Sequence, residues 1–267
     1  MSLYIASLNS GSNGNCYYVG NHREAVLIDA GLSCRETEKR LSRLGLSFKK
    51  IKAIFISHEH TDHTCGVEVM ARRYGLPVYL SEGTYRNSRL NLEENLVRQL
   101  KANVPEIIGE LMVSAFLKQH DASDPYSFTV TGGGVTVGVF TDMGSVCDDL
   151  TQHFSLCHAA FLESNYDEEM LEEGRYPRFL KSRISSDHGH LSNRQSLELF
   201  KAHRSPFLSH LLLSHLSQDN NNPQLVLDLF KQHANGTHIS IASRYEESPV
   251  YCISGSDEEP AIGGGLL

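Results

Sequence analysis

The hydrophobic positions of this chain fall into many short apolar runs, separated by turns rich in Gly, Ser and Asn. Short runs of apolar and β-branched residues between such turns predict β-strands. We expect strands over Leu3–Leu8, Cys16–Val19, Ala25–Ile28, Ile51–Ser57, Val78–Leu80, Val113–Leu117, Val135–Phe140, Ala159–Leu162, Leu211–Leu213, His238–Ala242 and Val250–Ile253. The wider region 92–117 is ambiguous, and short strands are its simplest interpretation.

Apolar residues recur at helical spacing in several of the segments between these strands. Gly45 and Gly75 follow two of these segments, where glycine ends helices. Asn222 and Pro223 begin another as N-cap and first helical residue. Helices are therefore expected over 35–44, 67–74, 193–202 and 223–232. Strands that alternate with helices indicate an α/β protein.

Two stretches of the chain repeat one plan. Ile54–His58 and Leu211–His215 each consist of an apolar strand that ends in Ser-His and precedes a loop and an amphipathic helix. This repeat indicates two sheets packed face to face with helices outside. No linker-like segment interrupts the pattern, so a single domain is expected over residues 1–253, followed by a disordered tail over 254–267 that is rich in Gly, Ser, Asp and Glu.

Composition narrows the classes of protein that fit this pattern. The formal net charge of −8 argues against coating nucleic acid by bulk electrostatics, although a local basic groove remains compatible with it. The six cysteines include no C-x-x-C pair, which indicates reduced thiols. Neither a signal peptide nor a membrane span is recognised. A cytoplasmic protein without membrane contact is expected, and its oligomeric state stays open.

One motif carries most of the chemical information. His58-Glu59-His60-Thr61-Asp62-His63 directly follows a predicted buried strand. Side chains two residues apart on an extended segment point the same way, so His58 and His60 can bind one ion together. Asp62 and His63 lie past the bend and can face a second ion. Imidazole and carboxylate ligands suit a divalent metal such as zinc; the alternative is a solvated His-rich loop.

Further metal-capable residues follow other predicted strands, namely His120, Asp142 and His215. A single histidine in such a place is more often structural than a ligand. The shared position at strand ends is more informative, because together these residues could complete the site begun by the motif.

This series of residues resembles the metallo-β-lactamase superfold, in which an early strand-end Asp precedes H-x-H-x-D-H and a later His, Asp and His. Asp29 matches the early Asp, and the resemblance extends from residue 1 to about 253. It implies a four-layer αββα sandwich of two mixed sheets. It also implies two divalent metal ions, with Zn²⁺ favoured and Mn²⁺ as the alternative.

The same resemblance implies a role for each ligand. One metal would be held by His58, His60 and His120, and the other by Asp62, His63 and His215, with Asp142 as the bridge and Asp62 also among the catalytic groups. Asp29 would orient the histidine loop by hydrogen bonding. Such a centre hydrolyses phosphodiesters, amides or thioesters, so it does not name the substrate.

Finer features resemble the YycJ/WalJ-like bacterial branch, whose members are regarded as DNA-processing 5′ exonucleases. These features are the turn Ser10–Asn15, the segment Gly189–Asn193 and the Ser-His-Leu-Ser run at 214–217. In related phosphodiesterases a strand-end Glu, here Glu163, pairs with a His, here His190, which protonates the leaving oxygen. A helix-capping Glu and a structural His are the alternatives.

Two groups of residues are candidates for contacts with phosphate. The glycine-rich turn, with Ser10, Asn13 and Asn15, could cradle a phosphate or only connect strands. A basic cluster precedes His190 and could form a groove for the nucleic-acid backbone or a solvated face; it contains Arg175, Arg178, Lys181 and Arg183. His188 contacts either the substrate or the groups behind the ligands, and the sequence does not decide which.

The residues and this resemblance together predict a two-metal phosphodiesterase, and the resemblance implies a nuclease that trims DNA from the 5′ end; the sequence itself leaves DNA against RNA and the polarity open. A hydrolase of small cyclic phosphodiesters and a thioester hydrolase are the alternatives, because both use the same metal site.

Overall fold

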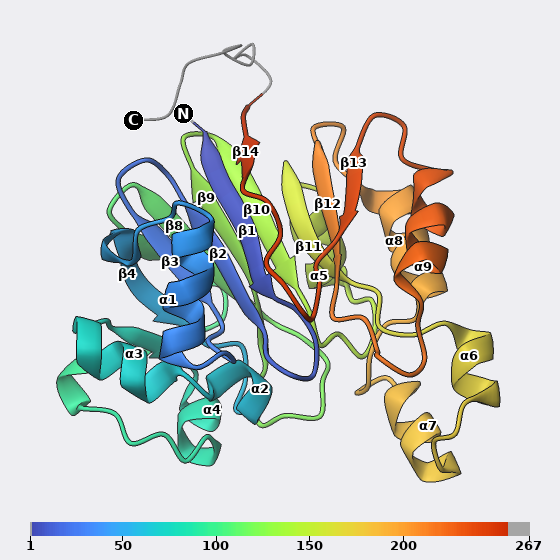
Figure 1. Ribbon diagram of the computed structural model, residues 1–267, viewed down its shortest axis with the longest axis horizontal. Coiled ribbons are helices and arrows are strands. Elements are labelled where there is room, and N and C mark those ends of the chain that lie inside the picture. Colours follow the sequence, from blue (N-terminus) through green and yellow to red (C-terminus); the bar gives the residue numbers. More distant parts are fainter. Residues whose placement is uncertain (1, 256–267) are drawn as a thin grey trace.

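Two seven-stranded sheets form the centre of the computed structural model, which describes residues 2–255 (Figure 1). The first sheet has the order β14 (Tyr251–Ile253), β1 (Leu3–Asn9), β2 (Cys16–Gly20), β3 (Ala25–Ile28), β4 (Ile51–Phe55), β5 (Val78–Leu80) and β6 (Val97–Gln99). The second has the order β13 (His238–Ile241), β12 (His210–Ser214), β11 (Ala159–Glu163), β10 (Val135–Phe140), β9 (Tyr126–Gly132), β8 (Leu111–Leu117) and β7 (Glu106–Ile108). Apart from β14, each half of the chain builds one sheet.

Helices cover the outer face of each sheet. The first half of the chain contributes α1 (Cys34–Arg43), α2 (Thr61–Thr64), α3 (Val67–Tyr74), α4 (Glu82–Asn87) and two 3₁₀ turns, Phe48–Lys50 and Glu94–Leu96. The second half contributes α5 (Asp148–Phe154), α6 (Glu168–Glu173), α7 (Arg178–Ile184), α8 (Asn193–His203) and α9 (Pro223–Lys231). Helices α6 and α7 project below the second sheet, at the end of the molecule where α2 lies (Figure 1).

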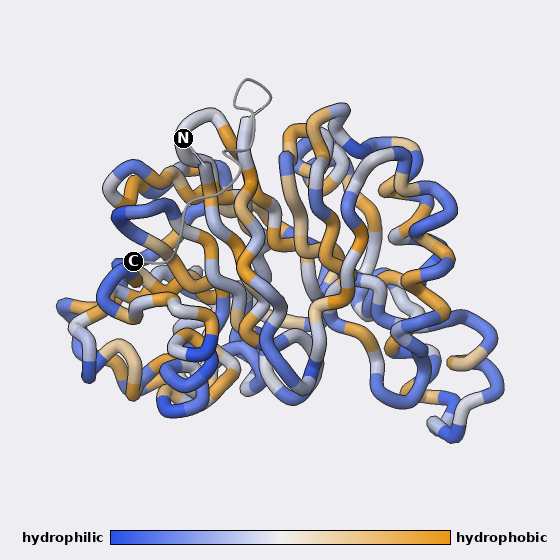
Figure 2. Tube along the Cα trace, turned by 45° about the horizontal axis from the view of Figure 1, so that its top comes forward, coloured by the Kyte–Doolittle hydropathy of each residue, from blue (hydrophilic) through white to orange (hydrophobic). Residues whose placement is uncertain are grey.

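Three layers of buried apolar side chains hold these elements together, and hydrophobic segments accordingly concentrate along the strands (Figure 2). The middle layer lies between the sheets and includes Phe55 and Phe128, whose ring centroids are 5.9 Å apart. The outer layers join the first sheet to α1 and α3, and the second to α5, α8 and α9. The predicted αββα sandwich is therefore confirmed.

Both sheets are mixed, and their parallel strands place the site. Strands β3 to β6 run parallel to one another, as do β10 to β13. The carboxyl ends of parallel strands meet at one edge of a sheet, where ligands usually bind in α/β proteins. The polar residues that follow β3, β4, β10, β11 and β12 consequently converge.

The predicted strands and four long helices are found with shifts of one or two residues at their ends. Strand β9 was not predicted, although Tyr126–Gly132 has the alternating Phe128-Thr129-Val130 pattern of a strand. Nor were α2 and α4 to α7, which have only four to seven residues each. Helix α7 has no buried residue, so its sequence shows no apolar periodicity from which a helix could be predicted.

Beyond its first two residues, the predicted tail at 254–267 lies outside the described part of the chain. Between residues 2 and 255, no helix is both long enough and apolar enough to cross a membrane.

Candidate active site

The site is built on residues that end strands in the left-handed backbone conformation. Asp29, Asp142 and His215 have φ values of 60°, 55° and 56°. They follow β3, β10 and β12, where the chain must turn sharply away from the sheet. Such values are uncommon outside glycine and store strain that tends to cluster at functional sites. The strand-end placement was predictable, whereas this backbone geometry was not.

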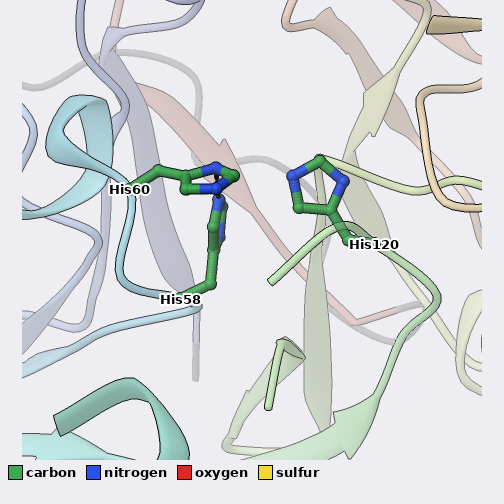
Figure 3. Close-up of side chains that lie close together, drawn as sticks. All are labelled: His58, His60 and His120. Atoms are coloured by element: carbon green, nitrogen blue, oxygen red, sulfur yellow. Dashed lines mark hydrogen bonds between the residues drawn. The ribbon is translucent and has the colours of Figure 1, made fainter. Parts of the chain in front are cut away.

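A first group of ligand atoms comes from His58, His60 and His120 (Figure 3). Their available nitrogens lie within 4.8 Å of one another, and His58 Nε2 is 3.0 Å from His60 Nδ1. Burial lowers the pKa of His58 well below its usual value, with help from the charge of His63. Burial likewise lowers the pKa of His120 to about 4. These two imidazoles are therefore neutral, which is the form that binds metals.

A second group comes from Asp62, His63 and His215. The carboxylate oxygen Asp62 Oδ2 lies 3.5 Å from His63 Nε2 and 3.9 Å from His215 Nε2. Burial alone would lower the pKa of His215, but the neighbouring carboxylates of Asp142, Asp62 and Glu163 raise it to about 10. Burial is also outweighed at His63, whose pKa is held well above its usual value by three aspartates, 29, 142 and 62.

Asp142 lies between the two groups. Its Oδ2 is 3.3 Å from His63 Nε2, and its Oδ1 is 3.4 Å from His215 Nε2 and 3.9 Å from His120 Nε2. Burial opposes ionisation of this carboxyl, but the charges of His215 and His63 hold its pKa well below the usual value. The carboxylate is thus ionised and faces both groups.

Several buried atoms in this centre lack a hydrogen-bond partner among the described residues: Asp142 Oδ2, His120 Nε2 and His215 Nε2. Buried polar atoms almost always have a hydrogen-bond partner, so three neighbouring atoms without one need an explanation. A set of imidazole nitrogens and carboxylate oxygens fits divalent cations such as zinc or manganese. The residues present therefore fit the metal binding that their pattern predicts.

Other side chains fix the orientation of the ligands. Asp29 is fully buried; its Oδ2 lies 2.7 Å from His63 Nδ1 and accepts a 2.9 Å hydrogen bond from Ser57 Oγ. His120 Nδ1 lies 3.1 Å from the Gly189 carbonyl oxygen. A ring nitrogen bound in this way leaves the opposite nitrogen free for a metal. Asp29 thus contacts His63 and Ser57, and its orienting role stays a prediction.

Glu163 and His190 form a hydrogen-bonded pair beside the centre. His190 Nδ1 lies 2.7 Å from Glu163 Oε1, and the ring is 5.2 Å from that of His215 between centroids. Glu163 Oε2 accepts hydrogen bonds from the backbone N–H groups of Met143 and Leu191. Burial alone would raise the pKa of Glu163, but the charge and hydrogen bond of His190 lower it to about 2.

This pair could in principle bind a cation with Asp142 and His215, since the four ligand atoms lie within 4.8 Å of one another. The acceptor sites of Glu163 are already used by two N–H groups and two imidazoles. With Nδ1 of His190 held by this carboxylate, Nε2 is the ring nitrogen left free, and it can give up a proton only when the ring is doubly protonated. The carboxylate oxygens of Glu163 are thus occupied, and His190 Nε2 is the atom of the pair that can act on a substrate or a cation.

The predicted phosphate-cradling turn is largely engaged in holding the site together. The Ser10 Oγ accepts a 2.8 Å hydrogen bond from the backbone N–H of His215. Asn15 Nδ2 donates to Asp62 Oδ2 at 3.2 Å. Asn13 is exposed, and its Nδ2 donates to the Arg244 carbonyl at 2.7 Å. Ser10 and Asn15 thus contact candidate ligands, and of the three residues only Asn13 is exposed.

The basic cluster divides in a similar way. Arg183 pairs with Asp121, beside His120, with a 2.6 Å hydrogen bond from Nε to Oδ2. Lys181 donates to the Glu172 carbonyl oxygen in α6. Arg178 and His188 are exposed and have no hydrogen-bond or ion-pair partner among residues 2–255. Arg175 is likewise exposed and has no such partner among the described residues, so Arg175 and Arg178 are the two members of the cluster with unpaired charges.

Two residues near the centre were missed. Lys118 is 4% exposed and donates from Nζ to the Thr141 carbonyl at 2.7 Å, next to Asp142. Asn165 Nδ2 donates to the His215 carbonyl at 2.7 Å. A lysine at the end of an apolar strand, two residues before His120, was the available signal for the first, whereas the second had none.

Comparison with known proteins agrees with this geometry. The family model described as Beta-lactamase superfamily domain matches residues 24–215. The Exodeoxyribonuclease YycJ of Bacillus anthracis is 35% identical over 237 residues, which cover 84% of this chain and 86% of the relative. The Exodeoxyribonuclease WalJ of Streptococcus pneumoniae is 32% identical, with coverage of 82% and 83%. Among solved structures, the metallo-beta-lactamase fold protein YhfI of Bacillus subtilis superimposes with a TM-score of 0.71 at 16% identity, over 94% of this chain and 100% of that one, which supports the fold.

Proposed function

The chain belongs to the metallo-β-lactamase superfamily, in its YycJ/WalJ-like branch, and we propose that this metal-dependent hydrolase is a nuclease that trims DNA from the 5′ end with two divalent ions. The observation that carries the proposal is the position of Asp142 between two ligand groups, with the Glu163–His190 pair beside them. Both related exodeoxyribonucleases support a DNA substrate.

The proposed ligand sets are His58, His60 and His120 for one ion, and Asp62, His63 and His215 for the other, with Asp142 shared. Zinc is the preferred ion on ligand chemistry, and manganese is the alternative. When bound, the pair of ions supplies a nucleophilic water at neutral pH and offsets the charge of the phosphate.

The remaining chemistry belongs to the chain itself. His190 Nε2 donates a proton to the sugar oxygen that leaves, because an alkoxide is a poor leaving group. Glu163 holds the imidazole by its Nδ1. Arg178 and Lys181 extend from α7 below the site and contact the backbone phosphates of the strand.

A digestion experiment tests the proposal. The protein reconstituted with Zn²⁺ or Mn²⁺ is incubated with single- and double-stranded DNA and RNA, labelled at either the 5′ or the 3′ end. We expect 5′-labelled DNA to release labelled mononucleotide first, with RNA much slower. Asp142→Asn, purified in parallel, controls for contaminating nucleases. If a cyclic nucleotide or a thioester is hydrolysed faster than DNA, the protein is a cyclic phosphodiesterase or a thioester hydrolase and not a nuclease.

The proposed phosphate contacts of α7 have their own test. Arg178→Ala combined with Lys181→Ala should weaken DNA binding and flatten its dependence on salt by about 0.7 per lost contact with single-stranded DNA. Lys49→Ala with Lys52→Ala, a matched pair at the opposite end of β4, should leave the salt dependence unchanged. If both double variants show the same salt dependence of DNA binding, the basic residues of α7 do not contact DNA and form only a solvated face.

A further inference from the structure

A cavity of about 350 Å³ lies beside the second ligand group, at the carboxyl ends of β12 and β13. Its lining combines apolar and polar side chains, including Ser10, Leu216, Gln218, Arg244 and Tyr245. It shares Ser10 with the metal centre, since the Ser10 hydroxyl holds the backbone of His215. The volume falls in the range of about 300–1,000 Å³ that is typical of small-ligand pockets.

Arg244 provides the charge in this cavity. Its Nη2 donates to Ser12 Oγ at 3.1 Å, whereas its Nη1 is buried and has no hydrogen-bond partner among the described residues. No carboxylate of residues 2–255 lies within ion-pair distance of its guanidinium. A buried, unpaired N–H is unfavourable unless a ligand supplies the acceptor. The planar guanidinium matches the oxygens of a phosphate group.

The turn that carries Arg244 and Tyr245 is fixed from three directions. The Ser10 N–H donates to the Ser243 carbonyl at 3.0 Å, Asn13 Nδ2 donates to the Arg244 carbonyl, and Arg40 Nη2 donates to the Tyr245 carbonyl at 3.0 Å. All three bonds use backbone oxygens, so the Tyr245 ring and the Nη1 group of Arg244 remain available. Binding groups on a preorganised turn lose little conformational entropy on contact with a ligand.

Tyr245 is 70% exposed, which is unusual for a large aromatic side chain in a rigid turn. An exposed ring beside a phosphate-binding arginine suits a nucleotide, because every base can stack on an aromatic face. Glu246 also lines the cavity and is exposed at its rim. Its negative charge would weaken the binding of an anion. Removing that charge should therefore strengthen nucleotide binding, whereas removing Arg244 should weaken it.

We propose that this cavity holds the terminal nucleotide of the DNA strand, with Arg244 on its 5′-phosphate and Tyr245 against its base. The inference rests on the proposed nuclease function and extends it to the recognition of an end. A terminal phosphate monoester carries more negative charge than an internal diester. A strand end with this group therefore binds the guanidinium more strongly than an internal position does.

The test compares DNA with a 5′-phosphate and DNA of the same sequence with a 5′-hydroxyl. We expect the wild-type kcat/KM to favour the 5′-phosphate about ten- to a hundred-fold, the usual worth of a hydrogen bond to a charged group. Arg244→Ala should remove this preference while metal content and the rate on 5′-hydroxyl DNA stay within about two-fold. Arg244→Lys keeps the charge without the fork and should retain a small part. Arg23→Ala, in the β2–β3 turn at the other end of the sheet, should retain all of it.

Binding measured without cleavage separates this inference from the nuclease proposal. Calorimetry with deoxyadenosine 5′-monophosphate should give weaker binding for Arg244→Ala and Tyr245→Ala, near wild-type binding for Tyr245→Phe, and tighter binding for Glu246→Gln. If the wild type trims DNA without regard to the 5′-phosphate, the inference fails and the nuclease stands. Arg244-dependent nucleotide binding by a protein that leaves DNA intact would support the cavity and remove the nuclease. A preference for 3′-phosphate ends overturns the assignment to 5′ ends.

Discussion

The chain reaches its metal centre twice by one sequence plan, at Ser57-His58 and at Ser214-His215, yet the two serines do different things. Ser57 Oγ donates to Asp29 Oδ2 and lies 2.9 Å from His58 Nδ1. Ser214 Oγ donates to the Leu212 carbonyl of its own strand. The hydroxyl that holds His215 belongs instead to Ser10, in the other half of the molecule.

This difference shows how the two halves depend on each other. The first half holds its histidine loop with its own residues, Asp29 and Ser57. The second half holds the His215 carbonyl with its own Asn165 but depends on Ser10 of the first half for the His215 N–H, and it adds the Glu163–His190 pair. We infer that the first half supplies mainly metal binding, while the second couples metal binding to proton transfer.

The sharpest way to break this comparison is to remove the ligand that both groups share. Asp142→Asn should lower activity by about 10⁴-fold or more, about 5.5 kcal/mol, because both ions of the proposed two-metal site would lose a ligand. Elemental analysis should fall from two metals per chain to fewer than one. Asp228→Asn on α9, exposed and distant, should retain both metals. One tightly held ion, unaffected by the Asp142 substitution, would argue against a bridge.

The second prediction separates the proton donor from the metal centre. His190→Ala should slow the cleavage of DNA by about 10²–10⁴-fold with metal content intact. The defect should shrink on a nitrophenyl diester, whose leaving group needs no proton. Glu163→Gln should reproduce part of the loss, and the double variant should be little worse than His190→Ala alone, as expected of residues that act as one unit.

His203→Ala, on the helix that follows His190, is the matched control for that series and should change neither substrate. If natural and nitrophenyl diesters slow equally, His190 positions the substrate and the proton comes from elsewhere.

Much of this centre could be predicted from the sequence because many of its residues directly follow predicted strands. Strand ends in a parallel sheet converge, so Asp142, Glu163 and His215, at the ends of β10, β11 and β12, could be brought together from the sequence. Their meeting with His58 of the other sheet was implied by the family resemblance. Partners across the two sheets could not be found in this way. Ser10 is 205 positions from His215, and a Gly/Ser/Asn turn has the composition expected of a phosphate cradle as much as of a support.

The same limit explains which elements of the fold could be predicted from the sequence. Long helices with apolar faces were placed within one or two residues, whereas α7, with no buried residue, left no periodic signal. Positive φ at Asp29, Asp142 and His215 follows from tertiary packing that over-determines the backbone, and no local pattern encodes it.

A third prediction concerns protons and distinguishes the two ligand groups. Burial keeps the pKa of His58 and His120 low, whereas the aspartates beside His63 and His215 keep theirs high. A metal must displace the protons of the second pair. When Zn²⁺ is added back to chelator-treated protein at about pH 8, its binding should therefore release at least one proton per chain. Histidines with the ordinary pKa of about 6.5 are already neutral at this pH and would release almost none. Calorimetry in buffers of different ionisation enthalpy measures this number. Asp62→Asn should reduce it, and a release near zero in the wild type would equate the two groups.

The smallest expected effects test the serines themselves. Ser57→Ala leaves Asp29 and His58 without a shared partner, and Ser10→Ala leaves the buried N–H of His215 unpaired; each should weaken metal affinity by about ten-fold, in line with about 1–3 kcal/mol for an unsatisfied buried group. Ser214→Ala removes only a bond within its own strand and should change metal affinity less than about two-fold, with a small loss of stability. Metal titration and thermal unfolding of the three variants decide the matter. If Ser214→Ala matches Ser57→Ala in metal affinity, the repeated sequence carries a repeated function after all, and the dependence of the second half on Ser10 must be abandoned.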